Sequence, residues 1–284
     1  MSEATDPTNT ITYQGVPGAN SHIACQEAYP EMTPLDCATF EDAFAAVESG
    51  RAALAMIPIE NSLGGRVADI HHLLPEANLY IIGEHFQPVQ YHLSAPKGAR
   101  LEDLEQVWSH VQALVQCREQ IRELGLEPVS RADTAGAARE VAKLGDPKIA
   151  VVCSRLAAEL YGLEILRSRF EDRLGNTTRF VILSRRRMDP DPKDGPCMTA
   201  LLFQVKSVPA ALYKSLGGFA TNGVNITKLE SYIIDPSFTV ARFYAEIEGH
   251  PADRAVARAL EELDYYSTQM RILGAFPAHA FRRG

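Results

Sequence analysis

"RRMDPDPKDGP", residues 186–196, separates two regions of the chain whose hydrophobic patterns differ. The stretch holds three prolines, three aspartates and no run of apolar residues. Segments of this composition do not build a core and are typical of the linkers that join folding units. We therefore expect a domain boundary here, with one folded region before it and another after it.

The region before the linker alternates short apolar runs with stretches of helical periodicity. "ALAMIPIE" and "KIAVVCS" have the length of buried strands, whereas "FEDAFAAVESG" and "TAGAAREVAKLG" have the spacing of amphipathic helices. Repeated strand–helix units predict an α/β architecture with a mainly parallel sheet. Two further helices are expected over residues 65–74 and 111–124, and Ser21 and Ser109 have the side-chain chemistry of helix N-caps.

The region after the linker has a different order of elements. Strand patterns are expected over residues 198–205, 226–234, 239–249 and 268–277, and helices over residues 209–223 and 251–266. The two middle strands are joined by "DPS", residues 235–237, which is a hairpin signal. The order βαββαβ predicts a ferredoxin-like module. Because such a module has an open sheet edge, pairing between copies predicts a homodimer or homotetramer.

The composition excludes several classes of function. A net charge of −8 and a hydrophobic fraction of 46% are those of an ordinary soluble protein and give no basic footprint for nucleic acid. The five cysteines are scattered without a CxxC pair, which predicts reduced thiols in a cytoplasmic protein and no metal site. The polar N-terminus lacks the apolar segment of a signal peptide, and no apolar run is long enough to cross a membrane.

Polar residues gather at turns beside the predicted strands of the first region. Each has an ordinary explanation: a glycine turn, a helix cap, a strand-forming threonine, or a solvent-exposed helix face for Gln112 and Gln116. Ligands of open α/β sheets bind beyond the strand ends, so these turns are also candidates for a site. The stretches are "QGVPGANSH" (14–22), "IPIENSLGGR" (57–66), "WSHVQALVQC" (108–117), "RADTAG" (131–136) and "NTTRF" (176–180).

Several of these stretches together carry a family resemblance. "IPIENS", "SHVQALVQC", "DTAGAA" and "NTTRFVILS", in this order, resemble prephenate dehydratase. The later stretch "PAALYKSLGGFATNGVNITKLES…FYAEIEG" resembles the ACT regulatory domain that follows the catalytic region in that family. The resemblance extends over about residues 11–277, and several motifs in a fixed order are far more specific than any one of them.

The resemblance implies a bilobed catalytic region like a type II periplasmic binding protein, with the substrate between two lobes. It implies that prephenate loses carbon dioxide and water to give phenylpyruvate in phenylalanine biosynthesis, without a metal or other cofactor because aromatisation drives the reaction. The implied boundaries are as follows: a catalytic domain at 11–185, with lobe 1 at 11–87 plus 171–185 and lobe 2 at 88–170; the linker at 186–196; and an ACT domain at 197–277.

The resemblance also assigns roles to residues. Thr178 is expected to act as a positioned hydrogen-bond donor to the leaving hydroxyl, because threonine is a poor general acid. Arg179 suits a substrate carboxylate, and Asn61, Ser109 and Gln116 are expected to bind or orient the substrate. Four neighbours complete the predicted set of substrate-binding residues: Glu60, Ser62, Thr177 and Phe180. Strand alternation places Thr178 and Arg179 on opposite faces, so a twisted strand or a long reach is needed for both to serve one site.

The predicted effector is L-phenylalanine, bound by the ACT region. The family pattern G-A-L-[VH] reads Ala210-Ala211-Leu212-Tyr213 here, and E-S-R-P reads Glu230-Ser231-Tyr232-Ile233. The residues expected to contact phenylalanine are Ala211, Leu212, Asn222, Asn225, Glu230 and Ser231. An alanine at 210 crowds the ligand, and the absent Arg-Pro removes a charge and a rigid turn, so an ACT region kept only for dimerisation stays an alternative.

Two other functions remain open from the sequence. Arogenate carries an amine where prephenate carries a keto group, so arogenate dehydratase is an alternative within the same family. A non-catalytic protein that binds and senses amino acids is an alternative outside enzymes; the absence of a signal-peptide pattern and the threonine at position 178 argue against it.

Overall fold

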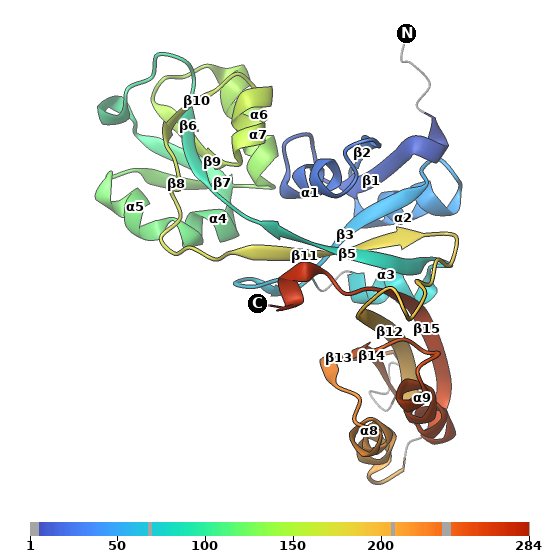
Figure 1. Cartoon of the computed structure of the whole chain (residues 1–284). Coiled ribbons are helices and arrows are strands. Elements are labelled where there is room, and N and C mark those ends of the chain that lie inside the picture. Colours follow the sequence, from blue (N-terminus) through green and yellow to red (C-terminus); the bar gives the residue numbers. More distant parts are fainter. Residues whose placement is uncertain (1–5, 68–69, 206–207, 235–239, 284) are drawn as a thin grey trace. The chain divides into compact units, whose positions relative to one another are not determined.

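In the computed structural model, the structure describes residues 6–67, 70–205, 208–234 and 240–283. The fold is mixed α/β, and the chain divides into two compact units (Figure 1). The first unit comprises Met1–Val67 and Phe86–Phe180, and the second comprises Ala68–His85 and Val181–Gly284. Strands β5 (Tyr80–Pro88) and β11 (Thr177–Ser184) each begin in one unit and end in the other.

The first sheet has the strand order β2-β1-β3-β11-β5, and β4 pairs with β3. β1 is parallel to both β2 and β3, as the repeated strand–helix pattern predicts. Its elements in the first unit are β1 (Thr10–Gln14), α1 (Asn20–Ala28), β2 (Thr33–Cys37), α2 (Phe40–Glu48), β3 (Leu54–Asn61) and β4 (Gly65–Arg66). The helix expected over residues 65–74 is therefore shorter: β4 occupies its start, α3 covers Ile70–Glu76, and residues 68–69 lie outside the described part.

The second sheet lies wholly in the first unit, with the order β10-β6-β9-β7-β8. β7 is parallel to β8 and β9, whereas β6 is antiparallel to β9 and β10. Its strands are β6 (His92–Ala95), β7 (Gln106–His110), β8 (Glu127–Arg131), β9 (Ile149–Cys153) and β10 (Glu164–Arg167). Its helices are α4 (Val111–Gln116), α5 (Arg118–Glu123), α6 (Thr134–Leu144) and α7 (Arg155–Leu160).

The prediction of one helix over residues 111–124 is wrong. The helix breaks at Cys117, whose φ of −115° and ψ of 15° are not helical. The Asp172 carboxylate accepts hydrogen bonds from the backbone N–H groups of Glu119 and Gln120, at 3.0 and 3.3 Å, and so caps the second piece. This cap comes from a residue far away in the sequence, which the local helical pattern does not reveal.

The second unit contains β12 (Cys197–Val205), α8 (Ala211–Thr221), β13 (Ile226–Ile233), β14 (Ala241–Glu248), α9 (Arg254–Tyr266) and β15 (Ser267–Pro277). These elements follow the expected order, and the sheet order is β13-β14-β12-β15. Figure 1 shows α8 and α9 on one side of this sheet and α3 on the other. The helix side is apolar, with Leu201, Phe203, Phe219 and Leu260 in one core cluster. The predicted hairpin turn, residues 235–237, lies outside the described residues.

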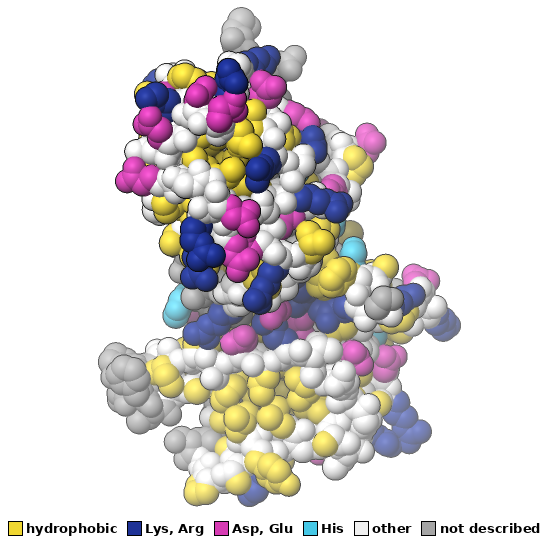
Figure 2. Space-filling view, turned by 90° about the vertical axis from the view of Figure 1, so that its left-hand side faces the viewer, with side chains coloured by type: hydrophobic (Ala, Val, Ile, Leu, Met, Phe, Trp, Pro, Cys, Tyr) yellow, Lys and Arg dark blue, Asp and Glu magenta, His cyan; other side chains and the backbone are white. Residues whose placement is uncertain are grey.

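None of the helices in the described residues has the length and apolar character needed to cross a membrane. On the face drawn in Figure 2, basic and acidic side chains are interspersed, and neither sign forms a broad field.

Candidate active site

A cavity of about 330 Å3 in the first unit is formed where several strands and connecting segments meet. All five stretches singled out by the sequence contribute to its lining. The lining residues are Gln14, Gly15, Ala19, Asn20, Ser21, Pro58, Asn61, Val67, Val89, Tyr91, His110, Gln112, Gln116, Ala132, Asp133, Thr134, Asn176, Thr178 and Phe180. The cavity is therefore rich in amides and hydroxyls, and among the described residues no lysine or arginine lines it.

A chain of side-chain hydrogen bonds crosses the cavity wall. The Asn61 amide donates to the Thr178 hydroxyl at 3.0 Å and to the Asn176 side-chain oxygen at 2.6 Å. The Asn176 amide in turn donates to the Gln116 side-chain oxygen at 2.7 Å. Three predicted residues, Asn61, Gln116 and Thr178, thus meet in one network, and Asn176 joins them.

Hydrogen bonds to both the oxygen and the nitrogen of its side-chain amide fix the orientation of Asn61. Its oxygen accepts the backbone N–H groups of Leu63 and Gly64, at 3.0 and 2.6 Å, while its nitrogen serves Thr178 and Asn176. Because the Thr178 hydroxyl accepts a bond from Asn61, its own proton is available for another acceptor. The arrangement thus offers a pre-oriented hydroxyl donor to whatever occupies the cavity.

Two of the helices that border the cavity, α6 and α1, differ in their caps. The Asp133 side chain accepts the Gly136 N–H at 2.6 Å and caps α6. α1 instead follows Ala19, with no side-chain cap, so the prediction of Ser21 as an N-cap is wrong. The uncapped N–H groups and the helix dipole make the start of α1 a favourable place for an anion.

Ser109 does not line the cavity. Its side chain is fully buried, and its hydroxyl donates to the Val152 carbonyl at 2.6 Å, which ties β7 to β9. The cap of α4 is the His110 ring nitrogen, which accepts the Gln112 N–H at 3.3 Å, so the prediction that Ser109 caps this helix is wrong. His110 and Gln112 are the residues of this stretch that reach the cavity together with Gln116.

Arg179 lies outside the cavity lining as well. The residue is only 6% exposed, and its guanidinium lies 3.9 Å from the Glu60 carboxylate and 5.9 Å from the Phe86 ring centre. Strand alternation explains the placement, because Thr178 and Phe180 share the face that lines the cavity. Arg179 and Glu60 therefore support β11 and β3 from the other face.

Ser62 and Thr177 hold the two strand ends together. The Ser62 N–H donates to the Thr177 carbonyl, and the Thr177 N–H donates to the Ser62 hydroxyl, both at 2.9 Å. Ser62 is exposed, and neither residue lines the cavity. Phe180 does line it and is buried, so it supplies an apolar part of the wall.

Two of the lining residues that were not selected as site residues from the sequence have side chains suited to a role in the site. Asn176 was assigned to a turn, although it directly precedes the threonine pair; its bond to Gln116 joins residues far apart in the chain. Tyr91 lies in the segment between β5 and β6, and burial raises the pKa of its hydroxyl, which keeps it protonated. No group of three or more histidine, cysteine or acidic side chains within the described chain is arranged to hold a metal ion.

The residues predicted to contact phenylalanine lie in the second unit and fall into two groups. Ala211 and Leu212 line a cavity of about 770 Å3 at the start of α8, together with Ala210 and Tyr213. Asn222, Asn225, Glu230 and Ser231 do not line it. Asn222 donates to Glu262 on α9 at 3.0 Å, and Glu230 pairs with Lys228 at 3.2 Å.

Sequence and structure comparisons place these features among known proteins. Residues 11–188 match the profile of the family described as "Prephenate dehydratase". A protein of Komagataeibacter europaeus described as a bifunctional N-acyl-homoserine lactone acylase/prephenate dehydratase is 52% identical, over 96% of this chain and 97% of its own length. Arogenate dehydratase 2 of Petunia hybrida is 36% identical, over 94% of this chain and 71% of its own length.

Two solved structures share the fold of the whole chain. One, described as GqqA, a novel type of quorum-quenching acylase, has a TM-score of 0.91 and 53% identity, and the match covers 96% of this chain and 100% of that one. The other is a prephenate dehydratase of Arthrobacter aurescens in complex with L-Phe. It has a TM-score of 0.86 and 30% identity, over 95% of this chain and 90% of its own.

Proposed function

The chain belongs to the prephenate dehydratase family, and from this premise we propose that it converts prephenate to phenylpyruvate with loss of carbon dioxide and water. The observation that carries the proposal is the Thr178 hydroxyl, which lines the cavity and accepts a hydrogen bond from the fixed Asn61 amide. Its own proton is therefore free for an acceptor in the cavity, which supports a role for Thr178 as the donor to the leaving hydroxyl of the substrate.

The other cavity groups suit the rest of the substrate. As the ring carboxylate leaves as carbon dioxide, its electron pair enters the ring and the hydroxyl departs with the electrons of its C–O bond, so negative charge develops on that oxygen, which becomes water by taking a proton from solvent. Thr178 stabilises this charge as a hydrogen-bond donor, and the gain of aromaticity supplies the driving force. We assign the remaining carboxylate to the uncapped start of α1, because Arg179 lies on the other face of β11.

The lining of the cavity supports prephenate, rather than arogenate, as the proposed substrate. The ammonium group of arogenate needs an acidic partner, and Asp133 is the one carboxylate among the described lining residues. Its oxygen already caps α6 through the Gly136 N–H. A keto group needs only a hydrogen-bond donor, which the amides and His110 provide.

Turnover of the two substrates tests the proposal. Purified full-length protein is incubated with prephenate or with arogenate, and phenylpyruvate and phenylalanine are quantified by absorbance in alkali and by chromatography, respectively. We expect the higher kcat/KM with prephenate. A higher kcat/KM with arogenate contradicts the substrate assignment, and no turnover of either by folded protein contradicts the enzymatic function and favours a binding protein.

Because the chain belongs to this family, we also propose the domain organisation expected from the sequence. A catalytic domain at residues 11–185 would have two lobes of the periplasmic-binding-protein type, followed by the linker at 186–196 and an ACT domain at 197–277. The βαββαβ order of β12 to β15 supports the last assignment, and an open sheet edge supports assembly into a dimer or tetramer. The L-Phe complex of the Arthrobacter aurescens relative supports feedback by phenylalanine.

A second candidate activity is hydrolysis of N-acyl-homoserine lactones. The Komagataeibacter europaeus relative is described as an acylase as well as a dehydratase. A second cavity of about 510 Å3 adjoins the first through Gln112 and Gln116, which line both. The exposed side chains of Leu63, Val111 and Val115 line it and suit an apolar acyl chain. Release of homoserine lactone from an N-acyl substrate tests the proposal, and Val115→Asp is expected to reduce this activity selectively.

A further inference from the structure

The face of the second unit's sheet turned away from α8 and α9 carries rows of polar side chains. In the strand register, Leu202 lies opposite Arg271, and Gln204 lies between Arg242 and Gln269. Directly opposed residues on neighbouring strands have side chains close together on one face of a sheet. Two arginines and two amides are thus gathered around one leucine.

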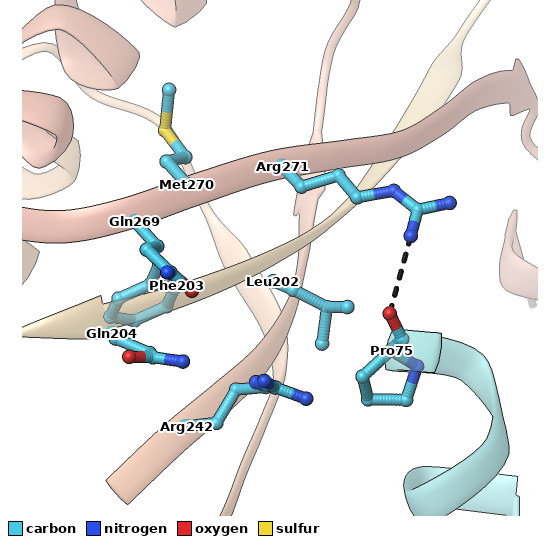
Figure 3. Close-up of a pocket in the computed structure, with 8 residues that line it drawn as sticks. All are labelled: Pro75, Leu202, Phe203, Gln204, Arg242, Gln269, Met270 and Arg271. Atoms are coloured by element: carbon cyan, nitrogen blue, oxygen red, sulfur yellow. Dashed lines mark hydrogen bonds between the residues drawn. The ribbon is translucent and has the colours of Figure 1, made fainter. Parts of the chain in front are cut away.

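Strand alternation shows which face these residues occupy. Leu201 and Phe203 belong to the apolar core under the helices, so Leu202 and Gln204 project to the other side. Figure 3 shows Leu202 and Arg242 on the side of Pro75, while Met270 points away from them. The polar rows therefore lie on the face of the sheet that is turned towards α3, opposite the face covered by α8 and α9.

A cavity of about 330 Å3 lies between this face and the end of α3 (Figure 3). This volume is at the lower end of the range of small-molecule sites. Its lining includes Pro75, Leu202, Gln204, Arg242, Gln269 and Arg271. The cavity thus combines an apolar floor and wall with cationic and amide side chains.

The positive charges of Arg242 and Arg271 are only weakly neutralised by their partners. Arg271 donates to the backbone carbonyls of Pro75, Ala77 and Leu79, at 3.3, 2.8 and 3.2 Å, and these acceptors carry no net charge. Arg242 pairs at 3.3 Å with Glu76, whose side chain is 79% exposed. An ion pair so open to solvent is screened and contributes little, so Glu76 is readily replaced by another anion.

Arg282, in the same unit, has a positive charge that is fully neutralised by neighbouring carboxylates. Arg282 binds Glu84 through two nitrogens, at 2.7 and 2.9 Å, and binds Glu246 at 3.2 Å. Both carboxylates are fully buried. Within the described part of the unit, Arg282 therefore has buried carboxylate partners whereas Arg242 and Arg271 have none, which leaves excess positive charge at the cavity.

Gln204 supplies a second polar group that a ligand in the cavity can bind. The residue is 9% exposed, yet its side-chain amide forms a hydrogen bond with none of the described residues. Its amide atoms are not among the buried side-chain atoms that lack a partner, so they are open to the cavity and can bind a ligand group there. The amide lies in the row that contains Arg242, so one ligand group can reach both.

We propose that this cavity binds a small aromatic or aliphatic monocarboxylate. The carboxylate binds Arg242 and the Gln204 amide in place of Glu76, and the apolar body packs on Leu202 and Pro75. A carboxylate is the anion whose planar geometry matches a guanidinium, and a neutral apolar body suits the floor of the cavity. The site is separate from the cavity that contains Thr178, which lies in the other unit.

Binding of the ligand in this cavity changes the contacts between α3 and the sheet. Arg271 and Arg242 both contact the end of this helix, Arg271 through the Pro75 carbonyl and Arg242 through the Glu76 carboxylate. A ligand that displaces Glu76 removes the contact between Arg242 and this helix, and residues 77–79 lead directly into β5. The proposed ligand therefore changes the restraint on a segment that continues into the first unit.

Calorimetric titration of the full-length protein with sodium phenylacetate tests the proposal. We expect saturable binding of one phenylacetate per chain at this site and at least a tenfold loss of affinity for Arg242→Gln, because the charged partner is removed. Glu76→Gln is expected to bind several-fold more tightly, because the competing carboxylate is gone. 2-Phenylethanol, which has the ring but no charge, should not bind there.

Matched variants locate the binding. Arg258→Gln removes an exposed arginine from α9 in the same unit and should leave the affinity unchanged. Any phenylacetate bound near Thr178 is unaffected by Arg242→Gln and is recognised by its loss in Thr178→Ala. Equal affinity in wild type and Arg242→Gln overturns the proposal, and so does an absence of saturable binding. If the melting temperature of Arg242→Gln differs from that of wild type, the test rests on Glu76→Gln. Tighter binding of phenylacetate by Glu76→Gln then supports the proposal, and unchanged or weaker binding overturns it.

Discussion

The two units build their polar clusters from different groups. In the first unit, neutral amides and a hydroxyl form a chain from Gln116 through Asn176 and Asn61 to Thr178. In the second unit, full charges dominate: Arg282 joins two buried glutamates. Neutral dipoles orient a reacting group at little cost in stability, whereas buried charges depend strongly on one another. Disruption of the first cluster should therefore affect turnover, and disruption of the second should affect folding.

The largest expected effect is on stability, at Arg282. Arg282→Gln leaves Glu84 and Glu246 buried without their arginine, and we expect a loss of about 3–5 kcal/mol in the free energy of unfolding. Chemical denaturation measures this loss. Arg283→Gln changes the adjacent, exposed arginine and should cost almost nothing. A small effect of Arg282→Gln would show that the buried cluster does not stabilise the second unit.

The next effect is on catalysis, at Thr178. Thr178→Ala removes the donor to the leaving oxygen, and we expect kcat to fall roughly 10²- to 10³-fold with little change in Tm. Thr178→Ser keeps a hydroxyl and should retain part of the rate. Thr177→Ala is the matched control, because Thr177 does not line the cavity. Near-wild-type turnover by Thr178→Ala would contradict the role of this residue.

Some features of both units could be predicted from the local sequence pattern alone. Alternation on β11 already placed Thr178 and Arg179 on opposite faces, and the structure has Thr178 in the cavity wall and Arg179 against Glu60. The order of elements after the linker follows from hydrophobic periodicity, which is local as well. These features need no knowledge of the tertiary structure.

The features that the sequence did not reveal depend on partners distant in the chain. Asn176 becomes part of the site through Gln116, 60 positions away. The helix expected over residues 111–124 breaks where Asp172 caps its second half. Pairing of side chains across such separations is set by the fold, and no periodicity in one sequence encodes it.

A third effect is smaller and concerns the start of α8. Ala210 has a φ of 61°, in the left-handed region that costs an L-residue about 1 kcal/mol, and the family pattern has glycine at this position. Ala210→Gly should therefore raise the free energy of unfolding by up to about 1 kcal/mol. Ala211→Gly, one residue into the helix, should lower it by a similar amount. Effects of the same sign at both positions would show that the backbone strain at Ala210 is not relieved.

The smallest expected effect is a pH dependence that neutral histidines give to both units. Burial, with a further contribution from Arg155, lowers the pKa of His92 in the first unit below its ordinary value of 6.5. Burial and His85 lower the pKa of His279 in the second unit. Below pH 6.5 the unfolded chain therefore binds protons that the folded chain does not, so stability falls as the pH drops from 7.5 to 5.5.

Denaturation at both pH values in His92→Gln and His279→Gln separates the two contributions. Each substitution should reduce the difference in stability between pH 7.5 and 5.5, because one group that is protonated only on unfolding is removed. The His92 side chain is buried, and its Nδ1 forms no hydrogen bond with the described residues, so protonation there is opposed by desolvation without a compensating partner. An unchanged difference in His92→Gln would mean that His92 keeps an ordinary pKa in the folded protein.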